Sequence, residues 1–209
     1  GFRNANSNLN MGQIYKNIEK YVDRLDDIDG TFVEIGSSRP GDDQSTQYLA
    51  ALAKRIGMSF VTCDINKDRV AELNNRGISA TCLKGEEFIP MYAPKISIAY
   101  LDNFDWNWHP MATEEWTLDQ IKEYRDKYNI EMTNVYSQAA HVHQAVLIES
   151  RTTDNSIICI DDTWFHSTWD TYQGKGGAAV PYLLAKGYTV LETTNGRSGE
   201  YGIILGRFG

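Results

Sequence analysis

The stretch TFVEIGSSRPGDDQSTQYLAALAKRI, residues 31–56, decides the fold. Its opening TFVEIG is mostly apolar and predicts a short buried strand that ends at Gly36. From residue 44 onward the apolar residues return at helical spacing, which predicts a helix over 44–56. A glycine-containing loop joins the strand to the helix. Such a loop turns backbone N–H groups toward a ligand at the carboxyl end of the strand.

The same alternation of short apolar runs and amphipathic segments continues to the end of the chain. Strands that alternate with helices predict an α/β fold with a parallel sheet covered on both faces. A turn at 195–199 separates the last two strands, so the final strand should be antiparallel. We therefore expect a Rossmann-like, doubly wound, seven-stranded sheet, mostly parallel with an antiparallel last strand. Besides 31–36, the predicted strands are 58–65, 78–83, 95–102, 156–161, 188–193 and 200–208; besides 44–56, the predicted helices are 11–25, 67–76, 117–128, 133–150 and 178–186.

The pattern also divides the chain. We expect an N-terminal helical segment over 1–30 and one ligand-binding domain over 31–209. Residues 103–132 interrupt the rhythm of strands and helices, and we expect them to form a lid insertion in that domain.

Composition excludes several classes of protein. The 209 residues carry a formal net charge of −8, which argues against nucleic acid as the partner. No apolar run approaches the ~20 residues that a membrane span needs. The three cysteines have no metal-like spacing and lie in apolar runs, so we expect buried reduced thiols. Together with an N-terminus that lacks a signal-peptide core, they favour a cytoplasmic protein.

Acidic residues stand at the ends of the first three predicted strands. Around Gly36 the loop carries Glu34 and lacks the G-x-G-x-x-G fingerprint, so it suits a ligand with an ammonium or sulfonium end. Asp64 ends the second strand and can accept both hydroxyls of a ribose; alternatively it caps the following helix. Glu86 or Glu87 can accept from an adenine amino group, and an ordinary helix-start carboxylate explains them equally well.

Three further carboxylates follow the fourth and fifth strands. Asp102 ends one strand, and Asp161 and Asp162 end the other. Neighbouring strands would bring the three charges together, which requires a bound cation, protonation or basic partners. Oxygen ligands alone favour Mg²⁺, Ca²⁺ or Mn²⁺ over Zn²⁺. In the alternative reading Asp161 and Asp162 only cap a turn.

The loops beside this edge hold histidine, tryptophan and glycine. His109 and His166 are candidate general bases or exposed loop residues, and either His141 or His143 could reach the cleft. The segment 174–177 could bind an anion, with Lys175 on an acidic substrate group, or be a plain helix-start turn. The five tryptophans form either a water-excluding lid or a satellite core or dimer contact. They are Trp106, Trp108, Trp116, Trp164 and Trp169.

The motifs VEIGSS, CDIN, LKGEEF, IAYLD and ICIDD, in this order and spacing, resemble the class I S-adenosylmethionine-dependent methyltransferases. The resemblance covers about 31–209. The tail IDDT…GKGGAAVPYL is similar to small-molecule O-methyltransferases of the cephalosporin-biosynthesis and catechol types. It implies methyl transfer from S-adenosylmethionine to a small-molecule acceptor, at a hydroxyl oxygen, with a divalent ion in the metal-dependent branch. A non-catalytic binding or regulatory protein with the same fold is the alternative, and a homodimer is left open.

The resemblance also implies roles for single residues. It assigns the methionine end of the cofactor to Glu34, Gly36, Ser37 and Ser38, the ribose to Asp64 and Ile65, the adenine edge to Gly85 and Glu86, the methyl group to Asp102, and the divalent ion to Asp102, Asp161 and Asp162.

Two positions depart from the metal-dependent branch. That branch often has Asn at the position of Asp162, and a Lys base at the position of Asp105. The general base would then come from elsewhere, with His109 and His166 as candidates, or be unnecessary.

Overall fold

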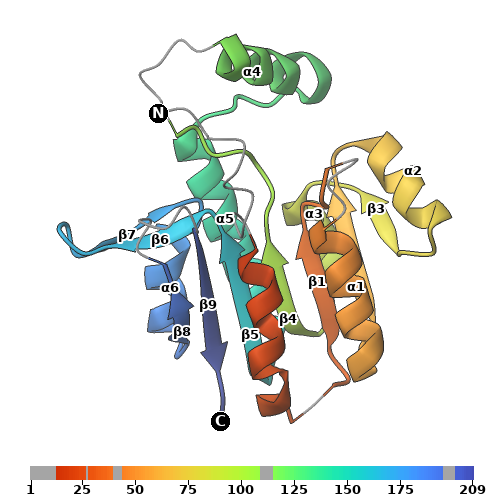
Figure 1. Cartoon of the computed structure of the whole chain (residues 1–209), viewed down its shortest axis with the longest axis vertical. Coiled ribbons are helices and arrows are strands. Elements are labelled where there is room, and N and C mark those ends of the chain that lie inside the picture. Colours follow the sequence, from red (N-terminus) through yellow and green to blue (C-terminus); the bar gives the residue numbers. More distant parts are fainter. Residues whose placement is uncertain (1–12, 27, 40–43, 109–114, 195–200) are drawn as a thin grey trace, which may run out of the picture.

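The computed structural model describes residues 13–26, 28–39, 44–108, 115–194 and 201–209. Its main sheet has seven strands in the order β3-β2-β1-β4-β5-β9-β8 (Figure 1). Strands β1 to β5 pair in parallel, whereas β9 is antiparallel to both β5 and β8. The predicted fold class, with its antiparallel last strand, is confirmed. The strands are β1 (Thr31–Ile35), β2 (Phe60–Asp64), β3 (Ala80–Cys82), β4 (Ile96–Leu101), β5 (Thr152–Asp161), β8 (Thr189–Thr193) and β9 (Gly202–Arg207).

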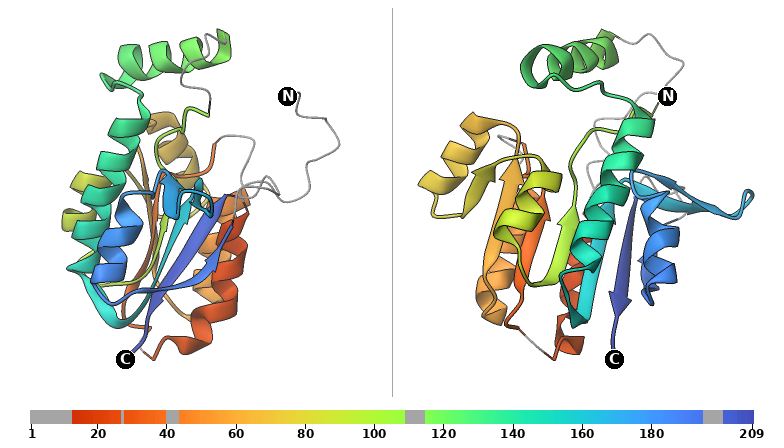
Figure 2. Two further views of the ribbon diagram at one scale, coloured as in Figure 1. Left: turned by 90° about the vertical axis from the view of Figure 1, so that its left-hand side faces the viewer. Right: turned by 180° about the vertical axis from the view of Figure 1, so that it is seen from behind.

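Helices cover both faces of the sheet (Figure 2). On one face η1 (Ile14–Arg24), a 3-10 helix, and α1 (Gln44–Ile56) pack over a core that includes Phe32 and Ile98. On the other, α3 (Gly85–Tyr92), α5 (Asn134–Glu149) and α6 (Ala179–Ala185) pack over Val33 and Ile158. The helix α2 (Lys67–Asn75) flanks β2 and β3, and α4 (Glu115–Tyr128) lies beyond the carboxyl ends of the strands (Figure 1).

The N-terminal segment is part of this fold. Ile14, Tyr15 and Ile18 of η1 are buried, and a Cβ added at Gly202 of β9 would lie 2.5 Å from the Ile14 side chain. Helix η1 therefore sits directly on the sheet. None of the helices in the described ranges is long and apolar enough to cross a membrane.

The structure departs from the predicted elements in three places. A loop was expected after β5, but β6 (Thr163–His166) and β7 (Thr171–Gly174) form an antiparallel hairpin there. The Trp, Phe, Tyr and Thr residues of this segment favour strands. Apolar and polar residues do not alternate strictly along it, so its sequence did not distinguish strands from an aromatic-rich loop. Helix α3, with Pro90 inside it, was not among the predicted helices and appeared only as the helix-start alternative for Glu86 and Glu87. One of the three cysteines, Cys82, is exposed on the short edge strand β3, so the expectation that all three thiols are buried is wrong for it.

Gly36 fixes how two loops meet at the carboxyl edge. Its φ is +87°, and a Cβ there would lie 2.6 Å from both the Cα and the N of Asn103. The loop after β1 therefore packs main chain against main chain on the loop after β4. Only glycine has both the backbone freedom and the missing side chain that this contact requires.

We expect Gly36→Ala to destabilise the chain more than Gly77→Ala. Both glycines have a positive φ, which costs an alanine about 1–2 kcal/mol. A Cβ added at Gly77 would meet no atom of the described residues within 4 Å, whereas one at Gly36 would also displace backbone, which adds about 1–3 kcal/mol. Urea unfolding of the two variants measures the difference, and equal losses would contradict the proposed close contact.

Candidate cofactor pocket and acid cluster

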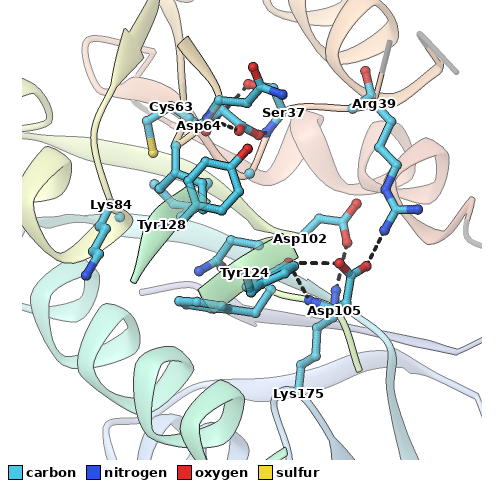
Figure 3. Close-up of a pocket in the computed structure, with 18 of the residues that line it drawn as sticks. Ser37, Arg39, Cys63, Asp64, Lys84, Asp102, Asp105, Tyr124, Tyr128 and Lys175 are labelled. Carbon is cyan, nitrogen blue, oxygen red and sulfur yellow. Dashed lines mark hydrogen bonds and ion pairs between the residues drawn. The ribbon is translucent and has the colours of Figure 1, made fainter. Parts of the chain in front are cut away.

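One pocket of about 770 Å³ opens at the carboxyl ends of β1, β2 and β4 (Figure 3). Seven of the nine residues expected to bind a cofactor line it: Gly36, Ser37, Ser38, Asp64, Ile65, Gly85 and Asp102. Glu34 and Glu86 are not among its lining residues. The sequence motifs therefore converge on one cavity, with two of their carboxylates turned elsewhere.

Glu34 lies beneath the loop after β1 and not in the pocket. Its side chain is fully buried, and Oε1 accepts hydrogen bonds from the hydroxyls of Thr46 (2.7 Å) and Thr62 (2.8 Å). The Thr46 hydroxyl in turn accepts from the backbone N–H of Ser38 (2.8 Å), and Thr62 shares a hydrogen bond with Ser37 (2.8 Å). Through two threonines, Glu34 holds the pocket loop from below.

Burial raises the pKa of Glu34 from 4.5 to about 7, against the lowering effect of the threonine hydrogen bonds. The neighbouring Asp102 carboxylate raises it further. Its Oε2 has no hydrogen-bond partner within the described part of the chain. A protonated Glu34 is therefore the form that this interior tolerates best.

Asp64 organises the loop as well as facing the pocket. Its Oδ2 accepts from the backbone N–H of Ser37 (3.2 Å), and its Oδ1 accepts from that of Asn66 (2.8 Å). Burial nonetheless raises the pKa of Asp64 above its ordinary value. The helix-capping alternative belongs to Asn66, whose side chain accepts from the N–H groups of Asp68 and Arg69.

Arg69 is a pocket-supporting residue that sequence reasoning missed. It is 2% exposed; its Nε donates to the Ser38 carbonyl (2.6 Å) and its Nη2 to the Ser38 hydroxyl (3.1 Å). An arginine on an amphipathic helix normally reads as a solvent-facing residue, so the sequence carried no signal for it. Ser38 is thus held by Thr46 on one side and by Arg69 on the other.

Glu86, the second predicted carboxylate that does not line the pocket, accepts from the side-chain amide of Gln144 on α5 (3.1 Å). At this end of the pocket the lining residues are Leu83, Lys84 and Gly85 instead. The adenine-edge role predicted for Glu86 therefore has no support from the lining of the cavity.

Asp102, Asp161 and Asp162 come together as predicted, each offering an oxygen within 4.8 Å of the others. A lysine lies among them. Lys175 Nζ is 3.1 Å from Asp102 Oδ1 and 3.0 Å from Asp162 Oδ2, and the lysine side chain is 3% exposed (Figure 3). Of the three compensations the sequence left open, a basic partner is the one that the structure contains.

These groups shift each other's pKa values. Burial opposes the charge of Lys175, but the Asp162, Asp102 and Asp161 carboxylates together raise its pKa well above its ordinary value. Burial and then the neighbouring Asp162 and Asp102 raise the pKa of Asp161 well above its own. Lys175 is therefore an ammonium.

A divalent ion does not fit this cluster together with Lys175. The three carboxylates are a suitable oxygen donor set, and Asp161 Oδ1 accepts no hydrogen bond from the described residues. However, the ammonium already binds one oxygen of Asp102 and one of Asp162. Two cations on the same pair of carboxylates would repel each other in a largely buried site.

Helix α4 lines the pocket with one face. Trp116, Gln120, Tyr124 and Tyr128 recur at i+4 spacing and all contribute to the lining. The Tyr124 hydroxyl donates to Asp105 Oδ2 (2.8 Å), and Arg39 forms an ion pair with the same carboxylate (Figure 3). Asp105 therefore links the loop after β1, the loop after β4 and helix α4.

The histidines contribute nothing to the described lining. His109 falls outside the described residues, and His166 stacks on Trp169 in the β6–β7 hairpin, 4.4 Å between ring centroids. His141 is fully buried, with Nδ1 2.7 Å from the Ser137 carbonyl, and burial lowers its pKa to about 3. His143 is exposed. No observation supports a general-base role for His166.

The tryptophans were expected to form either a water-excluding lid or a satellite core, and the structure contains some of each. Trp116 lines the pocket. Trp108 stacks on Trp164 (5.5 Å between centroids), and both contact Tyr201, forming an aromatic cluster that Trp106 joins through Trp164. Most of these side chains therefore form a satellite core between the loop after β4, the hairpin and the start of β9.

We expect Glu34→Gln to remove a pH-dependent loss of stability. Because the folded-state pKa is about 7 and the ordinary value 4.5, the Glu34 contribution is fully present below pH 4.5 and is lost as the pH rises through 7. At ~1.4 kcal/mol per pKa unit, the variant should gain up to about 3 kcal/mol on the wild type between pH 5 and pH 8. Urea unfolding at both values measures this.

Glu87→Gln is the matched control for Glu34→Gln, since it makes the same chemical change at an exposed residue of α3. Its stability difference from the wild type should stay nearly constant with pH. If the Glu34→Gln difference is equally constant, Glu34 ionises freely in the fold and the burial argument is wrong.

A scan against protein-family models and a search of curated proteins matched nothing. Solved structures match along most of the chain. OxaC in complex with SAH and oxaline has a TM-score of 0.57 at 14% identity; the match covers 96% of this chain and 48% of OxaC, so this chain spans about half of OxaC's length. The CMeT domain of the citrinin polyketide synthase has a TM-score of 0.53 at 12% identity, covering 93% of this chain and 51% of that chain.

A third match is to a protein assigned provisionally as an rRNA methylase, from Clostridium thermocellum. Its TM-score is 0.51 at 12% identity, and the match covers 93% of this chain and 94% of the other. Identities this low establish the fold and leave the acceptor open. The chain has the class I S-adenosylmethionine-dependent methyltransferase fold.

Proposed function

We propose that this chain transfers a methyl group from S-adenosylmethionine to a small-molecule acceptor, at a hydroxyl oxygen. The observation that carries the proposal is the pocket itself, in which residues of five separate motifs line one cavity at the carboxyl edge of the sheet. The cofactor supplies the reactive methyl group, and the protein binds, orients and excludes water. The S–CH₃ bond breaks as the O–CH₃ bond forms, its electron pair stays on the sulfur to give SAH, and the proton of the acceptor hydroxyl passes to solvent.

The pocket lining suits two parts of the cofactor, the ribose and the sulfonium. Asp64 places a carboxylate where two ribose hydroxyls can donate to it, and the loop of Ser37 and Ser38 presents backbone groups beside it. Asp102 brings negative charge to the region where the cationic sulfonium would lie. In this arrangement Glu34 acts on the cofactor indirectly, by holding the loop.

A small molecule suits the pocket better than RNA does. The cavity is lined by Asp64, Asp102, Asp105 and Asp162, and the whole chain has a formal net charge of −8, so a phosphate backbone would be repelled. OxaC was crystallised with oxaline, a small-molecule ligand, on the same fold. The divalent ion implied by the resemblance is left out of the mechanism, because Lys175 holds two of its three carboxylates.

We also propose that α4 is a lid over the bound cofactor. Its lining face carries two tyrosines and a tryptophan, and Tyr124 ties it to Asp105 at the mouth of the pocket. A closed lid would exclude water from the sulfonium and strengthen the electrostatic contacts inside.

Isothermal titration of the wild type should show binding of S-adenosylmethionine and of SAH, and no binding of NAD. Asp64→Ala should weaken S-adenosylmethionine binding at least tenfold, because each hydrogen bond to a charged group contributes ~1.5–3 kcal/mol. Asp154→Ala removes the same charge from an exposed residue near the start of β5, at the opposite edge, and should leave the affinity unchanged. A wild type that binds neither cofactor form overturns the proposed function.

Tyr124→Phe should speed the release of SAH by roughly threefold to tenfold, because it removes one hydrogen bond, worth ~1 kcal/mol, between the lid and Asp105. Stopped-flow displacement measures the rate. Tyr92→Phe makes the same change on α3, outside the pocket, and should leave the rate unaltered. Equal release rates in all three proteins would mean that α4 does not control access.

A further inference from the structure

Lys175 is brought to the acid cluster by the β6–β7 hairpin. The chain leaves the sheet at Asp161, runs out and back through the hairpin, and returns at Gly174 beside Asp162. Gly174 has a φ of +87°, and a Cβ there would lie 1.9 Å from the Asp162 carbonyl oxygen. The return of the chain to this point therefore depends on a glycine directly before the lysine.

The backbone around Lys175 is fixed on both sides. The N–H of Lys175 donates to the Asp162 carbonyl (3.0 Å), and the N–H of Gly176 donates to the Thr163 hydroxyl (2.9 Å). That hydroxyl donates to the Asp161 carbonyl (2.9 Å). These hydrogen bonds hold the backbone of Lys175 against the segment that supplies two of the three carboxylates.

The ammonium lies where the carboxylates of Asp102 and Asp162 face each other. Its distances of 3.1 and 3.0 Å to their oxygens are those of charge-assisted hydrogen bonds, and it comes from a side chain that is 3% exposed. An ion held by the same two oxygens would lie within a few ångströms of it, with little water to screen the repulsion. The cluster can hold one cation or the other.

We infer that the ammonium of Lys175 takes the place of a divalent ion, giving the chain a built-in cation beside the methyl-transfer position. The inference rests on the proposed function for the reaction that this cation serves. Within the described part of the chain, the carboxylates of Asp102 and Asp162 engage two of its three N–H donors, and Lys175 also lines the pocket. The third donor is available to hold the acceptor oxygen, which is the positioning that a bound metal would otherwise supply.

Electron paramagnetic resonance of Mn²⁺ tests the inference without an acceptor. Titration of the wild type with Mn²⁺ should show no saturable binding at the cluster. Lys175→Met keeps the length of the side chain and removes its charge, leaving three carboxylates within reach of one ion. The variant should bind Mn²⁺ at least tenfold more tightly than the wild type, and adding Asp161→Asn to it should abolish the gain.

Lys84→Met is the control, because it removes the same charge from another lysine of the pocket lining, at the far end from the cluster. It should not gain Mn²⁺ binding. Tight Mn²⁺ binding by the wild type that Asp161→Asn abolishes overturns the inference, as does a folded Lys175→Met that binds no better than the wild type. If Lys175→Met does not fold alone, refolding with Mn²⁺ should restore the folded protein. The wild-type titration tests the inference whether or not the variant folds.

Titration of the same proteins with S-adenosylmethionine separates this inference from the proposed function. A wild type that binds neither Mn²⁺ nor the cofactor would refute the proposed function and leave Lys175 as the cation of the cluster. A wild type that binds both would refute only the role of Lys175. The two failures are therefore distinguishable.

Discussion

Parallel pairing of β1 with β2 and β4, and of β4 with β5, is the constraint on which the rest of the structure depends. It places the carboxyl ends of four strands at one edge, and the residues there include Glu34, Asp64, Asp102 and Asp161. Carboxylates gathered at one edge repel each other and must be compensated. Three of the four acids have different partners: Glu34 receives threonine hydroxyls, Asp64 receives backbone N–H groups, and Asp102 receives Lys175.

Much of the fold and the location of the site could be predicted from the sequence, because both depend on local patterns. The helix over 44–56 has the predicted bounds, and the final strand is antiparallel. The acids Asp102, Asp161 and Asp162 were expected to meet, since they follow strands that neighbour each other. Periodicity identifies the strands, and a parallel sheet then determines which of their ends lie together.

Side-chain partners were harder to predict because they depend on which distant segments the fold brings together. Lys175 was read as a contact for an acidic substrate group, since nothing in a run of glycines shows that a hairpin folds it back onto Asp102. Arg69 looked like any charged residue on the outer face of a helix. Glu34 and Glu86 carry the right chemistry for a cofactor, yet their side chains point into the protein toward Thr46 and Gln144. The motif specifies the residue type, and its orientation depends on packing.

The contact between Gly36 and Asn103 has a consequence for the two halves of the pocket. The loop after β1 lines the pocket from Gly36 to Arg39, and the loop after β4 lines it from Asp102 to Asp105. Because their backbones touch without an intervening side chain, neither loop can shift without displacing the other. The Arg39–Asp105 ion pair spans the same two loops at the surface. The two loops are therefore coupled mechanically, and under the proposed function a cofactor bound at the first would influence the shape that the second presents to the acceptor.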